Sequence, residues 1–271
     1  MIAFPNGKIN IGLQVLEKRS DGFHNLQTIF YPLFIKEAVE IITNSTNSDV
    51  IFTASGISID GNIDDNLCVK AYQLLKQDFS KLPAVRIHLH KTIPMGAGLG
   101  GGSADAAFTL QLLNKKYELG LTNERLQTYA LSLGSDCPFF IINKPSYATG
   151  RGELLEPISL DLSNYSLLLA NPGIHINTGA AFSLLQDNSA PIPVNEAIKQ
   201  PIETWKENIL NDFETPVFSE YPEIKELKEN LYTSGALYAS MSGSGSSVYG
   251  IFEKNNCPTL NFPAHYFYKW V

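Results

Sequence analysis

Hydrophobic and polar residues alternate along several stretches of the chain, and this period of two is typical of half-buried β-strands. The clearest case is residues 85–90, where Val85, Ile87 and Leu89 alternate with an arginine and two histidines. Asp21-Gly22 and residues 60–62 are turn signals between such stretches. Together the patterns predict strands at residues 9–16, 23–33, 39–42, 50–53, 85–90, 139–142, 165–170, 236–240 and 248–252.

Other stretches repeat their apolar residues at helical spacing. Residues 66–79 form one such stretch, and Ala106, Leu110, Leu113 and Tyr117 form another, which Gly120 should end. Further helices are predicted at residues 122–133, capped by Thr122 and ended by Gly134, and near residues 178–186, 196–210 and 222–234. The pattern indicates an α+β fold with mixed sheets.

Proline and glycine gather between residues 143 and 164, which is typical of a domain boundary. We therefore expect one domain at residues 1–153 and a second at residues 154–271. A chain of 271 residues with 44% hydrophobic residues is long enough for two cores.

Composition narrows the classes of function. The formal charge of −7 argues against a nucleic-acid partner, so an anionic substrate has to be met by local donors. No stretch of 18 apolar residues occurs, which predicts no membrane span, and the polar start of the chain predicts a cytoplasmic location. Cys68, Cys137 and Cys257 are widely spaced and predict reduced thiols rather than a metal site.

A glycine-rich stretch at residues 94–104 is the strongest sign of chemistry in the chain. Glycines allow successive N–H groups to turn toward one point, and the helix that follows adds the positive end of its dipole. Such a loop favours a phosphate, with a flexible linker as the alternative. Ser103 is the predicted N-cap of the helix. The dinucleotide fingerprint fails because Glu118 falls near a helix end, and the Walker loop fails because no Lys-Ser or Lys-Thr pair follows.

Two ionisable residues stand at positions that suit a pocket. Lys8 lies between Gly7 and Asn10, just ahead of a strand, and Asp136 lies at the junction that follows Gly134. On spacing alone, a solvated surface lysine and a turn or N-cap aspartate are the favoured interpretations.

The stretch Pro94–Ala104 resembles the ATP loop of the GHMP kinases, a family that includes galactokinase, homoserine kinase and mevalonate kinase. Lys8-Ile-Asn10 and Met241–Ser246 are similar to the first and third motifs of that family, in the same order. The resemblance implies a two-domain α+β fold, with an N-terminal domain like ribosomal protein S5 and a ferredoxin-like C-terminal domain. It also implies a kinase that uses ATP and Mg²⁺ to phosphorylate an alcohol.

The resemblance also assigns roles to residues. Lys8 and Asp136 are expected to be catalytic, and Asn10, Phe23 and His24 to bind the substrate. Ser103 is the one side chain it suggests for a metal contact. The residues expected to bind ATP are Pro94, Met95, Gly96, Ala97, Gly98, Leu99, Gly100, Gly101, Gly102, Ser103 and Ala104, and those of the third glycine loop are Ser242, Gly243, Ser244 and Gly245.

The stretch Asp21–Thr28 and the residues around Asp136 resemble one branch of the family, whose substrate is a cytidine diphosphate polyol. Most members of that branch carry tyrosine where this chain has Phe23, which keeps the ring and removes a hydroxyl. The expected partners are therefore ATP and a small cytidine-containing polyol. A homoserine or mevalonate type of kinase and, less favoured, a dinucleotide-binding oxidoreductase are the alternatives.

Overall fold

The computed structural model describes residues 1–45, 48–59, 61–185 and 192–271 and divides into two compact units. Unit 1 comprises residues 1–7, 32–95 and 100–144, and unit 2 comprises residues 8–31, 96–99 and 145–271. Each unit is therefore assembled from three stretches of chain. The glycine-rich stretch contributes residues to both.

Unit 1 contains a four-stranded sheet in the order β1-β4-β6-β5. Its strands are β1 (Ile2–Ala3), β4 (Ala38–Thr43), β5 (Val50–Gly56) and β6 (Val85–Lys91). Strand β6 pairs antiparallel with β4 and parallel with β5. Val85, Ile87 and Leu89 are buried while Arg86 and His90 are exposed, so the alternation in the sequence marks one face of the sheet as the core.

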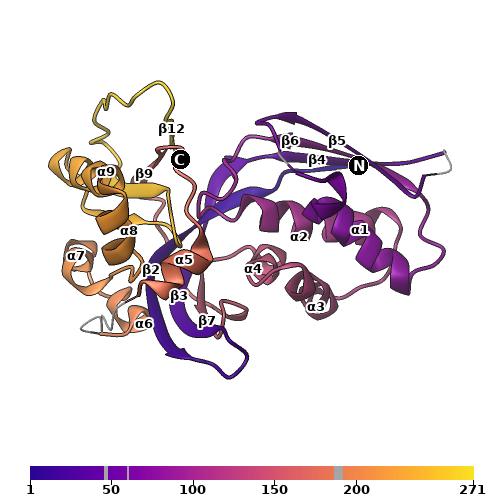
Figure 1. The fold of residues 1–271 in the computed structure, drawn as a ribbon, viewed down its shortest axis with the longest axis horizontal. Helices are drawn as coiled ribbons and strands as arrows, with labels where there is room; N and C mark the ends of the chain where they lie inside the picture. The colour runs from indigo at the N-terminus through magenta and orange to yellow at the C-terminus, as the bar shows by residue number, and fades with distance from the viewer. Residues whose placement is uncertain (46–47, 60, 186–191) are drawn as a thin grey trace. The chain divides into compact units, whose positions relative to one another are not determined.

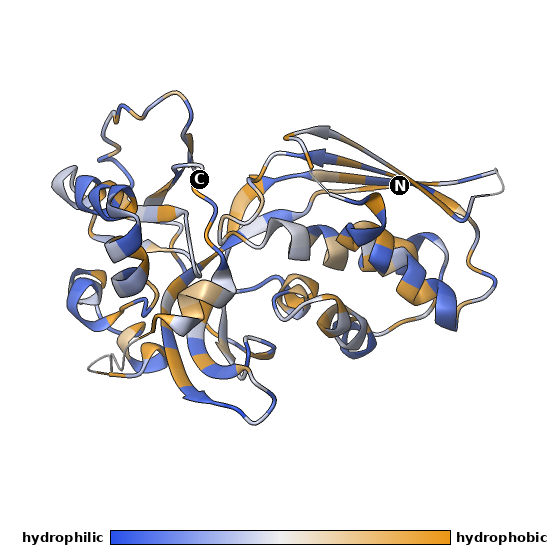
Figure 2. Ribbon diagram, in the orientation of Figure 1, coloured by the Kyte–Doolittle hydropathy of each residue, from blue (hydrophilic) through white to orange (hydrophobic). Residues whose placement is uncertain are grey.

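Helices cover one face of that sheet (Figure 1). The helices on the sheet are α1 (Leu67–Asp78), which η1 (Ile63–Asp65) precedes, and α2 (Gly101–Lys116), while α3 (Asn123–Leu133) and α4 (Cys137–Ile142) pack on α1 and α2. Hydrophobic and hydrophilic residues mix along α1 and α3, as expected for helices that bury one side (Figure 2). The Thr122 hydroxyl accepts the N–H of Arg125, which confirms the predicted cap of α3.

Two local predictions in unit 1 are wrong. Residues 139–142 were expected to form a strand but lie in α4, because a short apolar run fits either element and Pro138 favours the first turn of a helix. Helix α2 begins at Gly101, so its N-cap is Gly100 and not Ser103. Gly100 has φ +69°, a left-handed conformation that suits glycine.

Unit 2 contains two four-stranded sheets. The first has the order β2-β3-β7-β8, with β2 (Asn6–Lys18), β3 (His24–Lys36), β7 (Ser146–Thr149) and β8 (Leu154–Pro157). The second is antiparallel in the order β10-β11-β9-β12, with β9 (Tyr165–Asn171), β10 (Tyr238–Met241), β11 (Val248–Glu253) and β12 (Phe267–Trp270). The ends of β2 and β3 at residues 6–7 and 32–36 belong to unit 1.

The helices of unit 2 are mostly short: α5 (Thr178–Ser183), α6 (Val194–Ala197), η2 (Ile202–Thr204), α7 (Trp205–Asn208), α8 (Glu214–Glu220) and α9 (Pro222–Thr233). The single helix predicted at residues 196–210 is wrong. Pro201 stands in that range, and proline removes a backbone donor and disfavours helix before it. The end of the helix predicted at residues 178–186 and residue 60 of a predicted turn lie outside the described residues.

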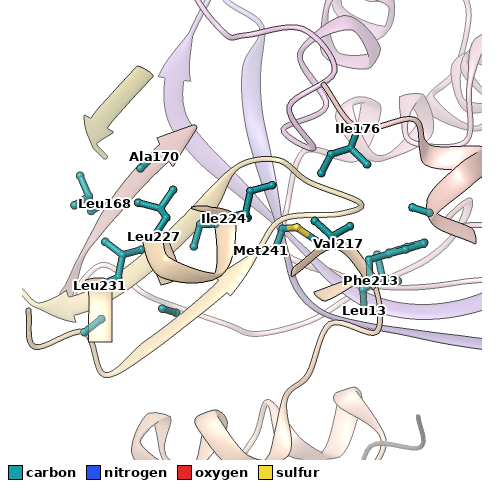
Figure 3. Packing of buried hydrophobic residues seen from close by; sticks show 14 of the residues in the cluster. Leu13, Leu168, Ala170, Ile176, Phe213, Val217, Ile224, Leu227, Leu231 and Met241 are labelled. Carbon is teal, nitrogen blue, oxygen red and sulfur yellow. The ribbon is translucent and has the colours of Figure 1, made fainter. Parts of the chain in front are cut away.

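The core of unit 2 forms where α8 and α9 pack on the second sheet (Figure 3). Ile224, Leu227 and Leu231 recur along α9 at helical spacing and are buried against Leu168 of β9 and Met241 of β10. This packing fixes the end of β10, from which the third glycine loop begins.

None of the helices in the described part of the chain has the length and apolarity needed to cross a membrane. The three cysteines are free thiols, as the sequence predicts, with Cys68 and Cys137 buried and Cys257 exposed.

Candidate active site

The residues that the sequence singles out are shared between the two units. Unit 2 holds Lys8, Asn10, Phe23, His24, Gly96, Ala97, Gly98, Leu99, Ser242, Gly243, Ser244 and Gly245. Unit 1 holds Pro94, Met95, Gly100, Gly101, Gly102, Ser103, Ala104 and Asp136.

In unit 2, Lys8 lies on β2 and is only 3% exposed. Its Nζ donates to Oδ1 of Asn10 at 2.5 Å and lies 4.9 Å from the centroid of the Phe30 ring. Burying an ammonium group requires such partners, because desolvation of a charge is costly. Lys8 is therefore not the solvated surface residue of the alternative interpretation.

The amide of Asn10 is held in one orientation by its neighbours. Its Nδ2 donates to Oγ1 of Thr28 at 3.0 Å, and that hydroxyl donates to the carbonyl of Gly12 at 2.5 Å. The Tyr249 hydroxyl donates to the backbone carbonyl of Asn10 at 3.0 Å. Oδ1 of Asn10 is thereby directed to Lys8. The sequence did not single out Thr28, although it lies in the stretch Asp21–Thr28 that carried the resemblance.

The third glycine loop packs directly on residues 96–99, also in unit 2. Oγ of Ser242 donates to the carbonyl of Gly98 at 2.8 Å and accepts the N–H of Asn10 at 3.2 Å. The N–H of Ser247 donates to the carbonyl of Ala97 at 3.2 Å. A Cβ on Gly98 would lie 2.0 Å from the carbonyl oxygen of Ser242, and the φ of Gly98 is +76°. Backbone approach this close is open only to glycine.

In unit 1, the other part of the glycine-rich stretch forms the first turn of α2. The N–H groups of Gly101, Gly102 and Ser103 belong to this turn, which has no intrahelical acceptors for them. Space beside Gly102 is open, since the nearest atom to an added Cβ is Cδ1 of Leu67 at 3.8 Å. A helix N-terminus of this kind attracts an anion through its N–H groups and its dipole.

A buried ionic cluster, which we call the charged support, lies beneath Gly101. Nζ of Lys91 donates to Glu37 at 2.6 Å and to Asp105 at 2.7 Å. The second oxygen of Glu37 accepts the N–H groups of Thr92 and Ile93, each at 2.9 Å. A Cβ on Gly101 would lie 3.1 Å from Nζ of Lys91. The φ of Gly101 is not positive, so the demand for glycine here comes from this contact.

The protonation of the charged support follows from its burial. Burial raises the pKa of Asp105 to about 8, against the opposing effect of the Lys91 ammonium. Burial acts to lower the pKa of Lys91, but Asp105 and Glu37 outweigh it and the pKa is raised. Sequence reasoning missed this cluster, because its members lie far apart along the chain and come together only in the fold.

Ser103 and Asp136 lie near the same buried thiol in unit 1. Burial raises the pKa of Cys137 to about 12, while a hydrogen bond with the Ser103 side chain lowers it and the adjacent Asp136 carboxylate raises it. Asp136 occupies the N-cap position of α4. The N-cap interpretation thus describes its place in the chain, and the catalytic role stays a prediction.

Phe23 and His24 follow the turn between β2 and β3, as expected. The Phe23 ring is 53% exposed, and the Arg151 guanidinium lies 4.6 Å from its centroid. The His24 ring stacks on Phe182, with centroids 5.1 Å apart and planes 14° from parallel. Such flat apolar faces suit a stacked base. No sequence motif indicates Arg151 or Phe182, which lie more than a hundred residues away along the chain.

The described residues contain no group of three or more His, Cys, Asp or Glu side chains that could hold a metal ion. A divalent ion at this site would therefore take most of its ligands from elsewhere.

Family models and relatives agree with this geometry. A model of the GHMP kinases' N-terminal domain matches residues 66–144, and one of their C-terminal domain matches residues 194–256. The chain is 51% identical over 254 residues to the 4-diphosphocytidyl-2-C-methyl-D-erythritol kinase of Bacteroides fragilis (strain YCH46), and the alignment covers 93% of this chain and 92% of that protein. The chain belongs to the GHMP kinase family.

Another relative, from Azobacteroides pseudotrichonymphae, carries the same enzyme name. It is 50% identical over 270 residues, with 98% of this chain and all of that protein aligned. The family is therefore supported over almost the whole length of the chain.

Solved structures of GHMP kinases share the fold. A crystal structure of 4-(cytidine 5'-diphospho)-2C-methyl-D-erythritol kinase aligns with a TM-score of 0.80 and 31% identity, covering 93% of this chain and 90% of that one. The mevalonate kinase of Methanococcus jannaschii aligns with a TM-score of 0.68 over 94% and 92% of the two chains, at 12% identity, and shows the fold alone. The two-domain α+β fold of the GHMP kinases is thus confirmed.

Proposed function

We propose that this GHMP kinase transfers the γ-phosphoryl group of ATP to the 2-hydroxyl of 4-diphosphocytidyl-2-C-methyl-D-erythritol, a step in the non-mevalonate synthesis of isoprenoid precursors. The observation that carries the proposal is the 51% identity, over 92% of its length, with a relative of that name. ATP as co-substrate is consistent with membership of the GHMP kinases. Three further predictions belong to this proposal: a domain boundary after residue 153, a cytoplasmic location and the absence of a nucleic-acid partner.

Phosphoryl transfer needs stabilisation of charge on the transferred group and removal of the hydroxyl proton. In this proposal the Asp136 carboxylate accepts the proton of the substrate hydroxyl. The Lys8 ammonium stabilises the negative charge on the transferred phosphoryl group. The hydrogen bond from Lys8 to Asn10 supports this assignment, because it fixes the direction of the ammonium group. Asn10 is assigned to the polyol of the substrate.

The nucleotide phosphates are assigned to the glycine-rich stretch and the third glycine loop. The open first turn of α2 supports binding of a phosphate by backbone N–H groups. In unit 2, the bond between Ser242 and Gly98 supports a shared role for residues 96–99 and 242–245.

Mg²⁺ is assigned to the nucleotide, with Ser103 as the one protein contact. Magnesium usually keeps several waters and binds substrate phosphates rather than a full cage of side chains. This fits the described part of the chain, which holds no group of three or more His, Cys, Asp or Glu side chains that could bind a metal ion. When bound, it supplies neutralisation of charge on the β- and γ-phosphates.

The experiment that tests the function is a transfer assay with ATP and a panel of alcohols. The panel contains 4-diphosphocytidyl-2-C-methyl-D-erythritol, its uridine analogue, homoserine and mevalonate, and binding of NAD is measured separately. We expect turnover with the cytidine substrate and weak or no turnover with the others. Turnover of homoserine or mevalonate instead would move the chain to another branch of the family, and tight NAD binding would favour the oxidoreductase alternative.

Recognition of cytidine is tested at Phe23. Stacking of a base on an aromatic ring is worth roughly 1–3 kcal/mol, so Phe23→Ala should raise KM for the cytidine substrate by about 5- to 150-fold and leave KM for ATP nearly unchanged. Phe34→Ala is the matched control, since Phe34 is another exposed phenylalanine, 82% accessible. An unaltered KM in Phe23→Ala would remove this ring from the substrate site.

A further inference from the structure

The segment Asn211–Glu214 follows α7 and ends at the first residue of α8, and its Asn211 and Glu214 side chains bond the backbone at the start of the third glycine loop. Asn211 and Asp212 are 3% and 5% exposed, and Glu214 is also buried. All of these residues and the loop belong to unit 2. Neither the motifs of the sequence nor the proposed function gives this segment a role.

Asn211 uses its whole amide group. Its Nδ2 donates to the carbonyls of Met241 and Gly243, both at 2.8 Å, and its Oδ1 accepts the N–H of Phe213 at 3.0 Å. The two carbonyls flank Ser242, whose hydroxyl bonds Gly98. Asn211 therefore fixes the backbone on both sides of that serine.

Glu214 binds the end of β10 from which the same loop begins. Its Oε1 accepts the N–H of Met241 at 2.8 Å and the hydroxyl of Ser240 at 3.1 Å, while Lys228 donates to its Oε2 at 2.6 Å. The N–H and the carbonyl of Met241 are thus bound by two residues of one segment.

The segment is itself fastened to β2, the strand that carries Lys8 and Asn10. The N–H of Asp212 donates to the carbonyl of Leu13 at 2.9 Å, and the N–H of Leu13 donates to the carbonyl of Leu210 at 2.9 Å. The N–H of Val15 donates to the Asp212 carboxylate at 2.7 Å. Hydrogen bonds and the short backbone segments between them therefore link β2 to Asn211, and Asn211 to the loop whose Ser242 bonds Gly98.

We infer that Asn211 is a positioning residue that sets Ser242 against Gly98 and thereby fixes the shape of residues 96–99 for the nucleotide phosphates. The inference rests on the proposed function for the identity of that ligand. These contacts require an amide at position 211. Among side chains of this size, only that of asparagine donates two hydrogen bonds and accepts one. Alanine would leave both carbonyls buried without a donor, and aspartate would face them with oxygens.

The test compares Asn211→Ala with Asn114→Ala in the full chain. Asn114 also bonds backbone groups, since its amide exchanges two hydrogen bonds of 3.0 Å with Leu121, but it lies near the other end of α2. Melting temperature, kcat, KM for ATP and amide hydrogen exchange of peptides covering residues 96–99 and 241–247 are measured below the melting transition. Asn211→Asp provides a second variant of native shape if Asn211→Ala does not fold.

For Asn211→Ala we expect kcat/KM for ATP to fall at least tenfold per folded molecule, with exchange in the two peptides at least tenfold faster. Asn114→Ala should lower the melting temperature and keep kcat/KM within about twofold of the parent. Unchanged kinetics or unchanged exchange in both Asn211 variants would overturn the inference. A parent chain that does not phosphorylate the cytidine substrate would instead overturn the proposed function, and the exchange measurement would still decide whether Asn211 holds the loop.

Discussion

The two parts of the glycine-rich stretch rest on interiors of different chemistry. Beneath Gly101, the charged support places the Lys91 ammonium between the carboxyl groups of Glu37 and Asp105. Around Gly98, the supporting side chains are themselves uncharged, although Asn10 also accepts the Lys8 ammonium, and we call Asn10, Thr28, Ser242 and Asn211 the neutral support. Both supports are buried, and each lies against a glycine: a Cβ would lie 2.0 Å from a backbone carbonyl at Gly98 and 3.1 Å from the Lys91 ammonium at Gly101.

The difference has consequences for stability. Removing one member of a buried ion pair leaves an uncompensated charge and is far more destabilising than losing a neutral hydrogen bond. A charged cluster also responds to pH, whereas amides and hydroxyls do not titrate in the physiological range. The supports should therefore differ in how strongly, and in what conditions, a substitution is felt.

The largest effect is expected for Lys91→Met. Without the ammonium group, the buried Glu37 carboxylate lies beside Asp105 with no cation to balance it, so the free energy of unfolding should fall by about 3–5 kcal/mol. Chemical denaturation with urea measures the loss. The triple variant Lys91→Met, Glu37→Gln, Asp105→Asn, which carries no charge in the cluster, should recover part of it. A loss below about 1 kcal/mol in the single variant would remove the contrast between the supports.

Asp136→Asn tests whether the charge of Asp136 serves catalysis rather than stability. The amide keeps the shape of the side chain and loses the basic oxygen, so kcat should fall by about 10²-fold or more while the melting temperature and affinity for ATP hold. Stopped assays with the cytidine substrate and calorimetry with ATP give the two readouts. Near-normal kcat would leave Asp136 with the N-cap position alone.

Thr28→Val tests the neutral support. The valine methyl cannot replace the hydroxyl between Asn10 and the carbonyl of Gly12, so the free energy of unfolding should fall by about 1–3 kcal/mol. Thr28→Ser keeps the hydroxyl and is the matched control, with a smaller loss expected. A valine variant as stable as the parent would show that the hydrogen bonds of this hydroxyl do not contribute to stability.

The sharpest contrast between the supports is expected in the pH dependence of Asp105→Asn. The pKa of Asp105 is raised from 3.8 to about 8, so between these values the folded chain holds a proton that the unfolded chain has released. Parent stability should therefore fall as pH rises from about 5 to 8. The asparagine variant lacks this dependence and should gain on the parent by about 1 kcal/mol per pH unit. Urea denaturation without nucleotide or Mg²⁺ measures the difference, and a difference independent of pH would contradict it. Thr28→Val should show no such slope.

The sequence predicted the elements whose signals are local. Helix α3 was recognised because Thr122 caps it and Gly134 ends it, and β6 because its alternation is strict. Residues 139–142 were misassigned because four apolar residues fit a buried strand as well as a helix. The side chain of Ser103 suits an N-cap, which is why the sequence predicts it there. Gly100 occupies the N-cap position instead, in a left-handed backbone conformation.

For the candidate site, sequence reasoning found residues that lie in recognisable motifs and missed their supports. Lys8, Asn10 and Ser242 are among the residues that the motifs single out. In the structure, Lys8 donates to the Asn10 side chain, and the N–H of Asn10 donates to Ser242, whose hydroxyl donates to Gly98. Asn211 bonds a loop that lies 30 residues away along the chain, and Lys91 bonds a carboxylate 54 residues away. Such pairings depend on the topology, which hydrophobic patterning does not specify to this precision.

The rate at which the cysteines react with a thiol reagent reports local opening of the chain. A maleimide reacts with thiolates, so Cys257, which is exposed, should be modified in the native chain, whereas Cys68 and Cys137 are buried and burial raises the pKa of both thiols. Both buried thiols belong to unit 1 and Cys257 belongs to unit 2. In a Cys257→Ser background, the rate of labelling would therefore report how often unit 1 opens, with no label attached beforehand and no denaturant added.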